Sequence, residues 1–266
     1  MSTELIDLKL AVLIDADNVP QKCIKGIMEE IALYGTPTIK RIYGDWTSPN
    51  IGGWKKVLLE HALTPVQQYG YTVGKNSTDS AMIIDAMDIL YAEKTDGFCI
   101  VSSDSDFTRL AIRLREAGKK VIGLGEKKTA NPFIVACDKF IYIEIIGTEE
   151  KEKQALSKQN KGRERKSEIQ DHEQAEKAGK VPPEVEKLIV NSVADLADED
   201  GFAFMGELGN LLLKKQPDFD PRNFGFNKLT TLIKSLDRFE IDARQTNYPH
   251  IKHIYLRDKK AENSVS

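Results

Sequence analysis

The chain has 266 residues, of which 41% are hydrophobic and 30% are charged, and its formal net charge at pH 7 is −3. This apolar content excludes a chain that is disordered throughout, and the length suits one large domain or two ordinary ones. No stretch reaches the ~20 apolar residues of a membrane span, and the N-terminus lacks a signal-peptide pattern, so we expect a cytoplasmic protein with no membrane contact. Because the chain is not basic overall, any nucleic-acid site must be a local patch.

The three cysteines form no CxxC pair, and their number is odd. This pattern argues against a disulfide framework and against a zinc ion bound by cysteines. We therefore expect buried, reduced thiols.

The first part of the chain, residues 1–148, alternates short apolar runs with segments of helical spacing. Apolar runs bounded by turn residues predict strands at residues 10–14, 38–43, 65–69, 97–101, 121–124 and 140–145. Apolar residues three and four apart predict helices at residues 20–34, 53–62, 79–93 and 107–114. Such alternation is typical of an α/β fold, with a mainly parallel sheet and helices on both faces.

Residues 149–180 differ from both flanks. They contain nine Lys or Arg and eight Asp or Glu, with no aromatic residue. Such a segment cannot form a core, so we interpret it as a charged linker between two domains. Residues 181–258 then show three helical patterns and a β-hairpin at 239–257, which together are typical of a small winged-helix domain, and a tail follows at 259–266.

Acidic residues occur where predicted strands of the first domain end. Asp15 ends the first strand, Asp104 and Asp106 follow the fourth, and Asp79 begins the helix after the third. In an open parallel sheet, the carboxyl ends of the strands form the usual functional edge. Taken singly, each of these residues could be only a helix cap.

Considered together, these carboxylates favour a metal site. Carboxylates at one edge of a sheet repel one another unless a cation lies between them. Mg²⁺ prefers such oxygen ligands, and two ions about 4 Å apart would support in-line phosphodiester hydrolysis. The sequence has no GxxxxGK[ST] phosphate loop, no GxGxxG after a strand and no GxSxG elbow, so no competing chemistry stands out.

Three ordered motifs of this domain resemble a known family. The segments LIDADNVP, KNSTDSAMIIDAMDIL and IVSSDSDFTRLAIRLREAGKKVIGLG are similar to motifs of LabA-like NYN domains, which belong to the PIN-like nuclease superfamily. The resemblance covers about residues 8–146 and implies an α/β/α sandwich whose acidic residues bind Mg²⁺ or Mn²⁺ for RNA cleavage. On the matching motif positions, the metal-binding and catalytic acids would be Asp15, Asp79, Asp104 and Asp106.

Two further positions match the family less directly. Asn18 corresponds to the asparagine three residues after the first aspartate, and Asp85 falls where the family is often acidic. Asp79 and Asp85 are six residues apart, which is about 120° around a helix, so they cannot both face one ion squarely. We expect Asp79 to be the ligand, and we expect Asn18 and Asp85 to support the ligands without binding the ion.

Three residues near the same edge are candidates for holding RNA. Arg41 and Lys75 could each contact a phosphate, and Trp46 could stack on a base. Each has a plainer alternative, because the tryptophan could pack under a loop and the cations could be solvated.

The C-terminal domain resembles a second family. A leucine-rich helix, the loop PDFDPRNFG and the segment FNKLTTLIKSL are similar to OST-HTH, or LOTUS, domains over about residues 182–257. The resemblance implies RNA binding and, for some members, a protein partner. Residues 181–266 carry 12 basic and 14 acidic residues, so RNA binding would need a local patch such as Lys214, Lys215 and Arg222. A solvated face that serves only solubility is the alternative.

The leading hypothesis is a metal-dependent endoribonuclease whose C-terminal domain recruits or positions RNA. One alternative is a non-catalytic RNA-binding regulator that keeps the fold. Another is a phosphatase of the haloacid-dehalogenase type, because Asp15 and Asp17 form a DxD pair. The acids after the fourth strand and the RNA-linked second domain make the phosphatase the weakest of the three.

We predict that limited proteolysis cuts the chain within residues 149–180, because this segment lacks the apolar residues needed for a core. Two resistant fragments should remain, and mass spectrometry would locate their ends. A single resistant unit of full length would contradict the predicted boundaries of the domains.

Overall fold

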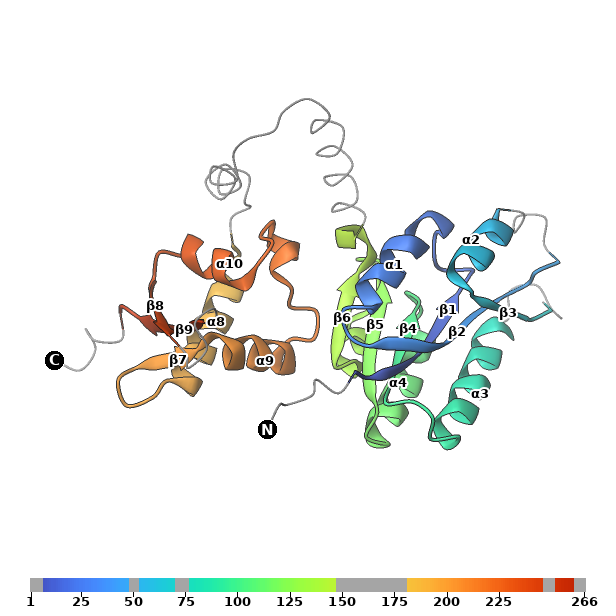
Figure 1. Cartoon of the computed structure of the whole chain (residues 1–266), viewed down its shortest axis with the longest axis horizontal. Helices are drawn as coiled ribbons and strands as arrows, with labels where there is room; N and C mark the ends of the chain where they lie inside the picture. Colours follow the sequence, from blue (N-terminus) through green and yellow to red (C-terminus); the bar gives the residue numbers. More distant parts are fainter. Residues whose placement is uncertain (1–6, 48–52, 70–76, 147–180, 246–251, 261–266) are drawn as a thin grey trace, which may run out of the picture. The chain divides into compact units, whose positions relative to one another are not determined.

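The computed structural model describes residues 7–47, 53–69, 77–146, 181–245 and 252–260. The chain divides into two compact units, at residues 1–161 and 162–266, which are drawn in Figure 1. The predicted linker at 149–180 lies outside the described residues. Among the described helices, none combines the length and the apolar character needed to cross a membrane.

Within the described residues, a six-stranded parallel sheet forms the centre of the first unit, in the order β3-β2-β1-β4-β5-β6. Its strands are β1 (Lys9–Asp15), β2 (Thr36–Gly44), β3 (Thr64–Gln67), β4 (Gly97–Val101), β5 (Lys120–Gly125) and β6 (Lys139–Tyr142). The strand order reverses between β1 and β4, which lie side by side. In open α/β sheets, ligands bind in the crevice outside the carboxyl ends of such a strand pair.

Helices cover both faces of this sheet (Figure 1). They are α1 (Ile24–Ile31), α2 (Trp54–His61), α3 (Ser77–Tyr91), α4 (Thr108–Glu116) and α5 (Asn131–Ala136). Side chains alternate along β1, so that Ala11 and Leu13 belong to the core under α3, α4 and α5, whereas Val12 and Ile14 belong to the core under α1 and α2. All four are fully buried. The predicted α/β/α sandwich is therefore confirmed.

The last strand of the sheet is shorter than predicted. Tyr142 pairs with Gly125, the final residue of β5, so the chain beyond Tyr142 has no partner strand in the described sheet. Residues 143–146 are helical instead, and Ile143 and Ile146 join the core under α1 and α2. The apolar run allows either structure, and the length of the neighbouring strand decides between them.

The helix α5 was not predicted, because its six residues are too few to show a helical period. Cys99 and Cys137, the residue after α5, are buried and form no disulfide, as expected. Cys23 also forms no disulfide, but it is only half-buried.

The second unit combines α-helices with a three-stranded antiparallel sheet in its described residues. Its elements are α8 (Pro183–Leu196), β7 (Phe202–Phe204), α9 (Met205–Lys215), α10 (Leu229–Ser235), β8 (Phe239–Gln245) and β9 (Lys252–Asp258). Its core includes Ile189, Leu208, Leu232 and Leu256, all fully buried. The predicted helices and hairpin strands are confirmed, whereas β7 was missed because three residues show no alternation. Residues 246–251, which connect the two strands of the predicted hairpin, lie outside the described residues.

We predict that Gly123→Ala destabilises the first unit. A Cβ at this position would lie 2.6 Å from a ring carbon of Phe140 and 2.8 Å from the sulfur of Cys137, both in the core. Overpacking of this kind lowers the free energy of unfolding by about 1–3 kcal/mol, measurable by urea denaturation. As a control, Val135→Ala changes an exposed side chain on α5 and should alter stability by less than about 0.5 kcal/mol. Equal stabilities of the two variants would contradict the prediction.

Candidate metal centre

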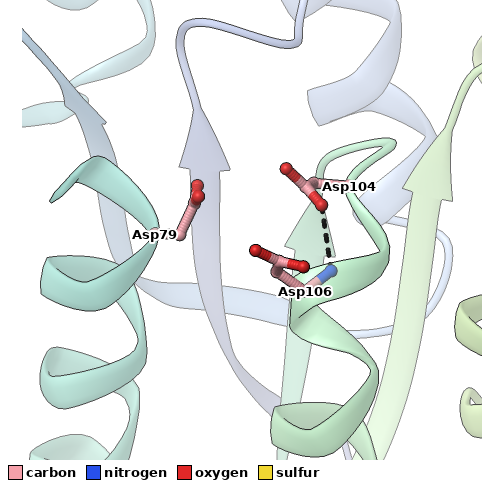
Figure 2. A group of neighbouring side chains, drawn as sticks. All are labelled: Asp79, Asp104 and Asp106. Atoms are coloured by element: carbon pink, nitrogen blue, oxygen red, sulfur yellow. Dashed lines mark hydrogen bonds between the residues drawn. The ribbon is translucent and has the colours of Figure 1, made fainter. Parts of the chain in front are cut away.

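Three carboxylates from two separate segments meet at the carboxyl edge of the parallel sheet. Asp79 lies in the first turn of α3, and Asp104 and Asp106 lie in the segment after β4. One carboxylate oxygen from each residue lies within 4.8 Å of the other two. Figure 2 shows these side chains gathered between the start of α3 and the turn after β4.

The turn after β4 is stabilised by a hydrogen bond within it and by a buried ring at its end. The carboxylate of Asp104 accepts a hydrogen bond from the amide of Asp106 at 2.9 Å (dashed in Figure 2) and so caps the short 3-10 helix η3 (Ser105–Phe107). Phe107 is fully buried, and its ring centroid lies 6.5 Å from that of Phe133 in α5. Anchoring of Phe107 in the core leaves Asp104 half-buried and Asp106 exposed at the sheet edge.

Asp15, the last residue of β1, is close to these acids but is engaged by the protein. It is 1% exposed, and its carboxylate accepts hydrogen bonds from Asn18 Nδ2 at 2.6 Å and Ser102 Oγ at 2.8 Å. The amide of Asp17 donates a third hydrogen bond, at 3.0 Å. Asp15 is not among the residues whose oxygens lie within 4.8 Å of one another. Asn18 therefore orients Asp15 rather than extending the group of three.

The electrostatics of this edge favour a bound cation. Burial, followed by the negative charges of Asp15, Asp104, Asp106 and Asp17, raises the pKa of Asp79 to about 6. Burial also raises the pKa of Asp15, despite the hydrogen bonds that act in the opposite direction. A divalent cation among the carboxylates would offset this repulsion, and carboxylate oxygens are the donors that hard ions such as Mg²⁺ prefer. The donor set and its charge thus fit a divalent ion.

Asp85 lies away from the three acids and joins α3 to the sheet. Its carboxylate accepts hydrogen bonds from the Arg41 guanidinium and from the Tyr43 hydroxyl, both on β2. Tyr43 is fully buried. The guanidinium of Arg41, predicted to hold a phosphate, is thus bound to Asp85 in this structure.

The other residues predicted to contact RNA in the first unit are Trp46 and Lys75. The indole N–H of Trp46 donates to the carbonyl oxygen of Val66 at 2.9 Å, and its ring meets Trp54 edge-on at 6.3 Å between centroids. The tryptophan is half-buried in this packing. Lys75 lies outside the described residues.

In the second unit, two of the three predicted RNA-binding cations contact carboxylates. Lys215 Nζ donates to Asp195 at 2.6 Å. Arg222, in the 3-10 helix η5 (Pro221–Phe224), donates twice to Asp220, at 3.0 and 2.8 Å, and its side chain is only 15% exposed. Lys214 is exposed on α9.

Comparison with known proteins places the chain in a family. A family model described as the NYN domain matches residues 9–144, just over half of the chain. The chain belongs to the NYN-domain family. NYN domains are typically nucleases of the PIN-like class. A second model, described as the OST-HTH/LOTUS domain, matches residues 179–250, and domains of this type bind RNA.

Two solved structures are similar to parts of the chain. The crystal structure of a protein of unknown function from Vibrio parahaemolyticus is 22% identical, with a TM-score of 0.44, and the match covers 52% of this chain and 93% of that one. The solution structure of an uncharacterized protein from Nitrosomonas europaea is 36% identical, with a TM-score of 0.27, and covers 31% of this chain and 77% of that one. No curated protein matches the chain.

Sequence analysis missed one residue that organises this edge of the NYN domain. Ser102 is fully buried directly after β4, where its hydroxyl donates to Asp15 and accepts from the amide of Asp104 at 3.1 Å. It thereby connects the end of β1 to the acidic turn after β4. The available signal was its position as the first polar residue after a wholly apolar strand, in the string SSDSD.

We predict that protonation of Asp79 makes the stability of the metal-free NYN domain depend on pH. The pKa of Asp79 is about 6 in the folded state and its ordinary value is 3.8, so the folded state binds this proton more tightly than the unfolded chain does. The stabilisation of the fold by this proton is therefore complete below pH 3.8 and is lost as pH rises through about 6. Relative to Asp79→Asn, the free energy of unfolding should fall over this window by on the order of 2–3 kcal/mol, since a tenfold change in proton affinity is about 1.4 kcal/mol.

Urea denaturation in EDTA at a series of pH values would measure this difference. Asp88→Asn is the matched control, because Asp88 is exposed on the same helix and its removal should leave the pH dependence unchanged. Parallel stability curves for the parent and Asp79→Asn would contradict the raised pKa.

Proposed function

We propose that this protein is a metal-dependent ribonuclease that hydrolyses phosphodiester bonds within RNA. The observation that carries the proposal is the meeting of Asp79, Asp104 and Asp106 at the edge where the strand order reverses, within a domain of a nuclease family. The OST-HTH/LOTUS domain of the same chain supports RNA as the substrate.

In this proposal, Asp79, Asp104 and Asp106 hold Mg²⁺ or Mn²⁺, and Asp15 is the predicted fourth ligand. When bound, such ions activate water and stabilise the negative charge that develops on the phosphate oxygens. Asp15 has a second role that requires no ion, because through Ser102 it fixes the turn that carries Asp104. Asn18 keeps the Asp15 carboxylate oriented.

Asp85 acts at a distance from the proposed site. Its hydrogen bonds to Arg41 and Tyr43 tie α3 to β2, and α3 carries Asp79. We assign Asp85 the role of positioning the helix. The C-terminal domain would bind RNA separately and, through the predicted linker at residues 149–180, raise the concentration of RNA near the acids.

We predict that Asp104→Asn abolishes RNA cleavage while the fold is kept. Loss of one ligand from a cluster of acids should lower the rate by orders of magnitude. Thermal stability without metal should hold or rise, because repulsion with Asp79 and Asp106 is relieved. The control is Asp88→Asn, which makes the same substitution at an exposed site and should cleave at the parent rate.

The assay uses labelled linear and circular RNAs with Mg²⁺, Mn²⁺ or EDTA. Cleavage of the circular RNA would establish internal cutting, because a circle has no ends. Unchanged cleavage by Asp104→Asn would contradict the assigned site. If the parent binds RNA but cleaves none with either metal, the protein is a non-catalytic RNA-binding regulator instead.

A further inference from the structure

One face of the small sheet in the OST-HTH/LOTUS domain carries a group of flat side chains. Ala203 of β7 pairs with Leu256 of β9, and both are fully buried against the helices, so their neighbours along each strand point to the opposite face. That opposite face, here called the planar face, presents rings and guanidinium groups from three strands: Phe202, Phe204, Arg244, His253, Tyr255 and Arg257.

The flat groups of the planar face contact one another across the strands. Arg244 lies over two rings, with its guanidinium carbon 4.1 Å from the centroid of Tyr255 and 4.8 Å from that of Phe202. Phe204 lies 5.5 Å from Tyr255 and 5.1 Å from His253, measured between ring centroids. Arg244 and His253 are exposed, whereas the three other rings are half-buried. The face is thus an extended aromatic surface that solvent reaches.

Both arginines of the planar face are fixed by carboxylates of β8. Arg244 donates to Asp242 at 2.8 Å, and Arg257 donates to Glu240 at 2.6 and 3.1 Å. Arg257 also lies over Phe202, at 4.9 Å from the ring centroid. These pairs hold the guanidinium planes in place and balance their charge. The surface therefore suits flat uncharged groups better than a bare chain of phosphates.

The predicted cation patch suits RNA less well. A phosphate that binds there would have to compete with Asp195 for Lys215. It would also have to compete with Asp220, which accepts two hydrogen bonds from the Arg222 side chain. The whole segment 181–266 carries a net charge of −2. A polyanion gains little from such a surface unless its bases supply the binding energy. Base stacking on the planar face would leave the ion pairs of Lys215 and Arg222 intact.

We propose that the planar face binds single-stranded RNA by stacking unpaired bases on Phe204, on His253 and on the Arg244 guanidinium that covers Tyr255. Every base has a flat face, so stacking of this kind tolerates different sequences, and a guanidinium such as that of Arg244 adds to the stack. Paired bases are hidden inside a duplex, so the face selects unpaired segments. The inference rests on the RNA-directed function proposed above and adds the location and the mode of recognition.

The test is a binding titration of the full chain in EDTA, so that no RNA is cut. The probes are a short single-stranded RNA, an abasic strand with the same number of phosphates, and a duplex. The variants are Tyr255→Leu, which keeps an apolar side chain but removes the ring, and Arg244→Lys, which keeps the charge but removes the flat group. Tyr91→Leu is the matched control, since Tyr91 is 69% exposed on α3 of the first unit.

We predict that the single-stranded RNA binds at least about tenfold more tightly than the abasic strand or the duplex, because stacking is the main source of affinity. Tyr255→Leu and Arg244→Lys should each weaken its binding by about tenfold, while Tyr91→Leu binds like the parent. Salt should weaken binding only slightly, since few phosphates are contacted. Photocrosslinking of a thiouridine-labelled RNA should map to peptides of β7 or β9.

Several results would overturn the proposal. Equal affinity for the abasic strand, or unchanged binding by both variants, would exclude base stacking on this face. Loss of binding with Lys214→Glu alone would place the RNA on α9. Absence of RNA binding even at low salt would indicate that the planar face binds a protein partner instead. Arg244→Lys alters an exposed side chain, so the test does not depend on the stability of Tyr255→Leu. Because binding is measured without metal, failure of the proposed nuclease activity would leave this result interpretable.

Discussion

Repulsion between carboxylates is the constraint on which the structure of the NYN domain depends. Asp79, Asp104 and Asp106 bring oxygens within 4.8 Å of one another, and Asp15 and Asp17 add negative charge nearby. Free in water, such groups would separate, so the rest of the fold must hold them together. A bound divalent cation offsets the same repulsion. The arrangement that is unfavourable without metal is therefore the one that makes the site suited to metal.

Buried contacts on several elements hold the acids in place. Phe107 anchors the turn after β4 in the core, and Ser102 joins that turn to Asp15 at the end of β1. On the other side, Asp85 and Tyr43 tie α3 to β2. Each contact links a segment that carries an acid to the central strands. The positions of the acids are therefore determined by the packing of the sandwich and not by the loops alone.

In the proposed function, the two domains bind the negatively charged RNA in different ways. In the NYN domain, phosphates approach an acidic edge, which requires cations between protein and substrate. In the OST-HTH/LOTUS domain, the planar face engages bases, and its arginines are already balanced by carboxylates. Neither mode depends on a strongly basic surface. The proposed function is therefore compatible with a net charge of −3.

The sequence by itself determined the α/β order of the first domain and the helices and hairpin of the second, because apolar period is a local pattern. It also indicated the acids at the end of β1, after β4 and at the start of α3, because strand ends and helix starts can be located from the same pattern. It did not determine where β6 ends, since this depends on the length of β5. Nor did it reveal the contact of Ser102 with Asp15 or that of Asp85 with Tyr43, because the two residues of each pair lie far apart along the chain. The planar face likewise exists only through the pairing of β7 with β9 and of β9 with β8. Only the tertiary structure decided these features, because strand register and side-chain contacts between distant segments bring together residues whose spacing in the sequence carries no signal.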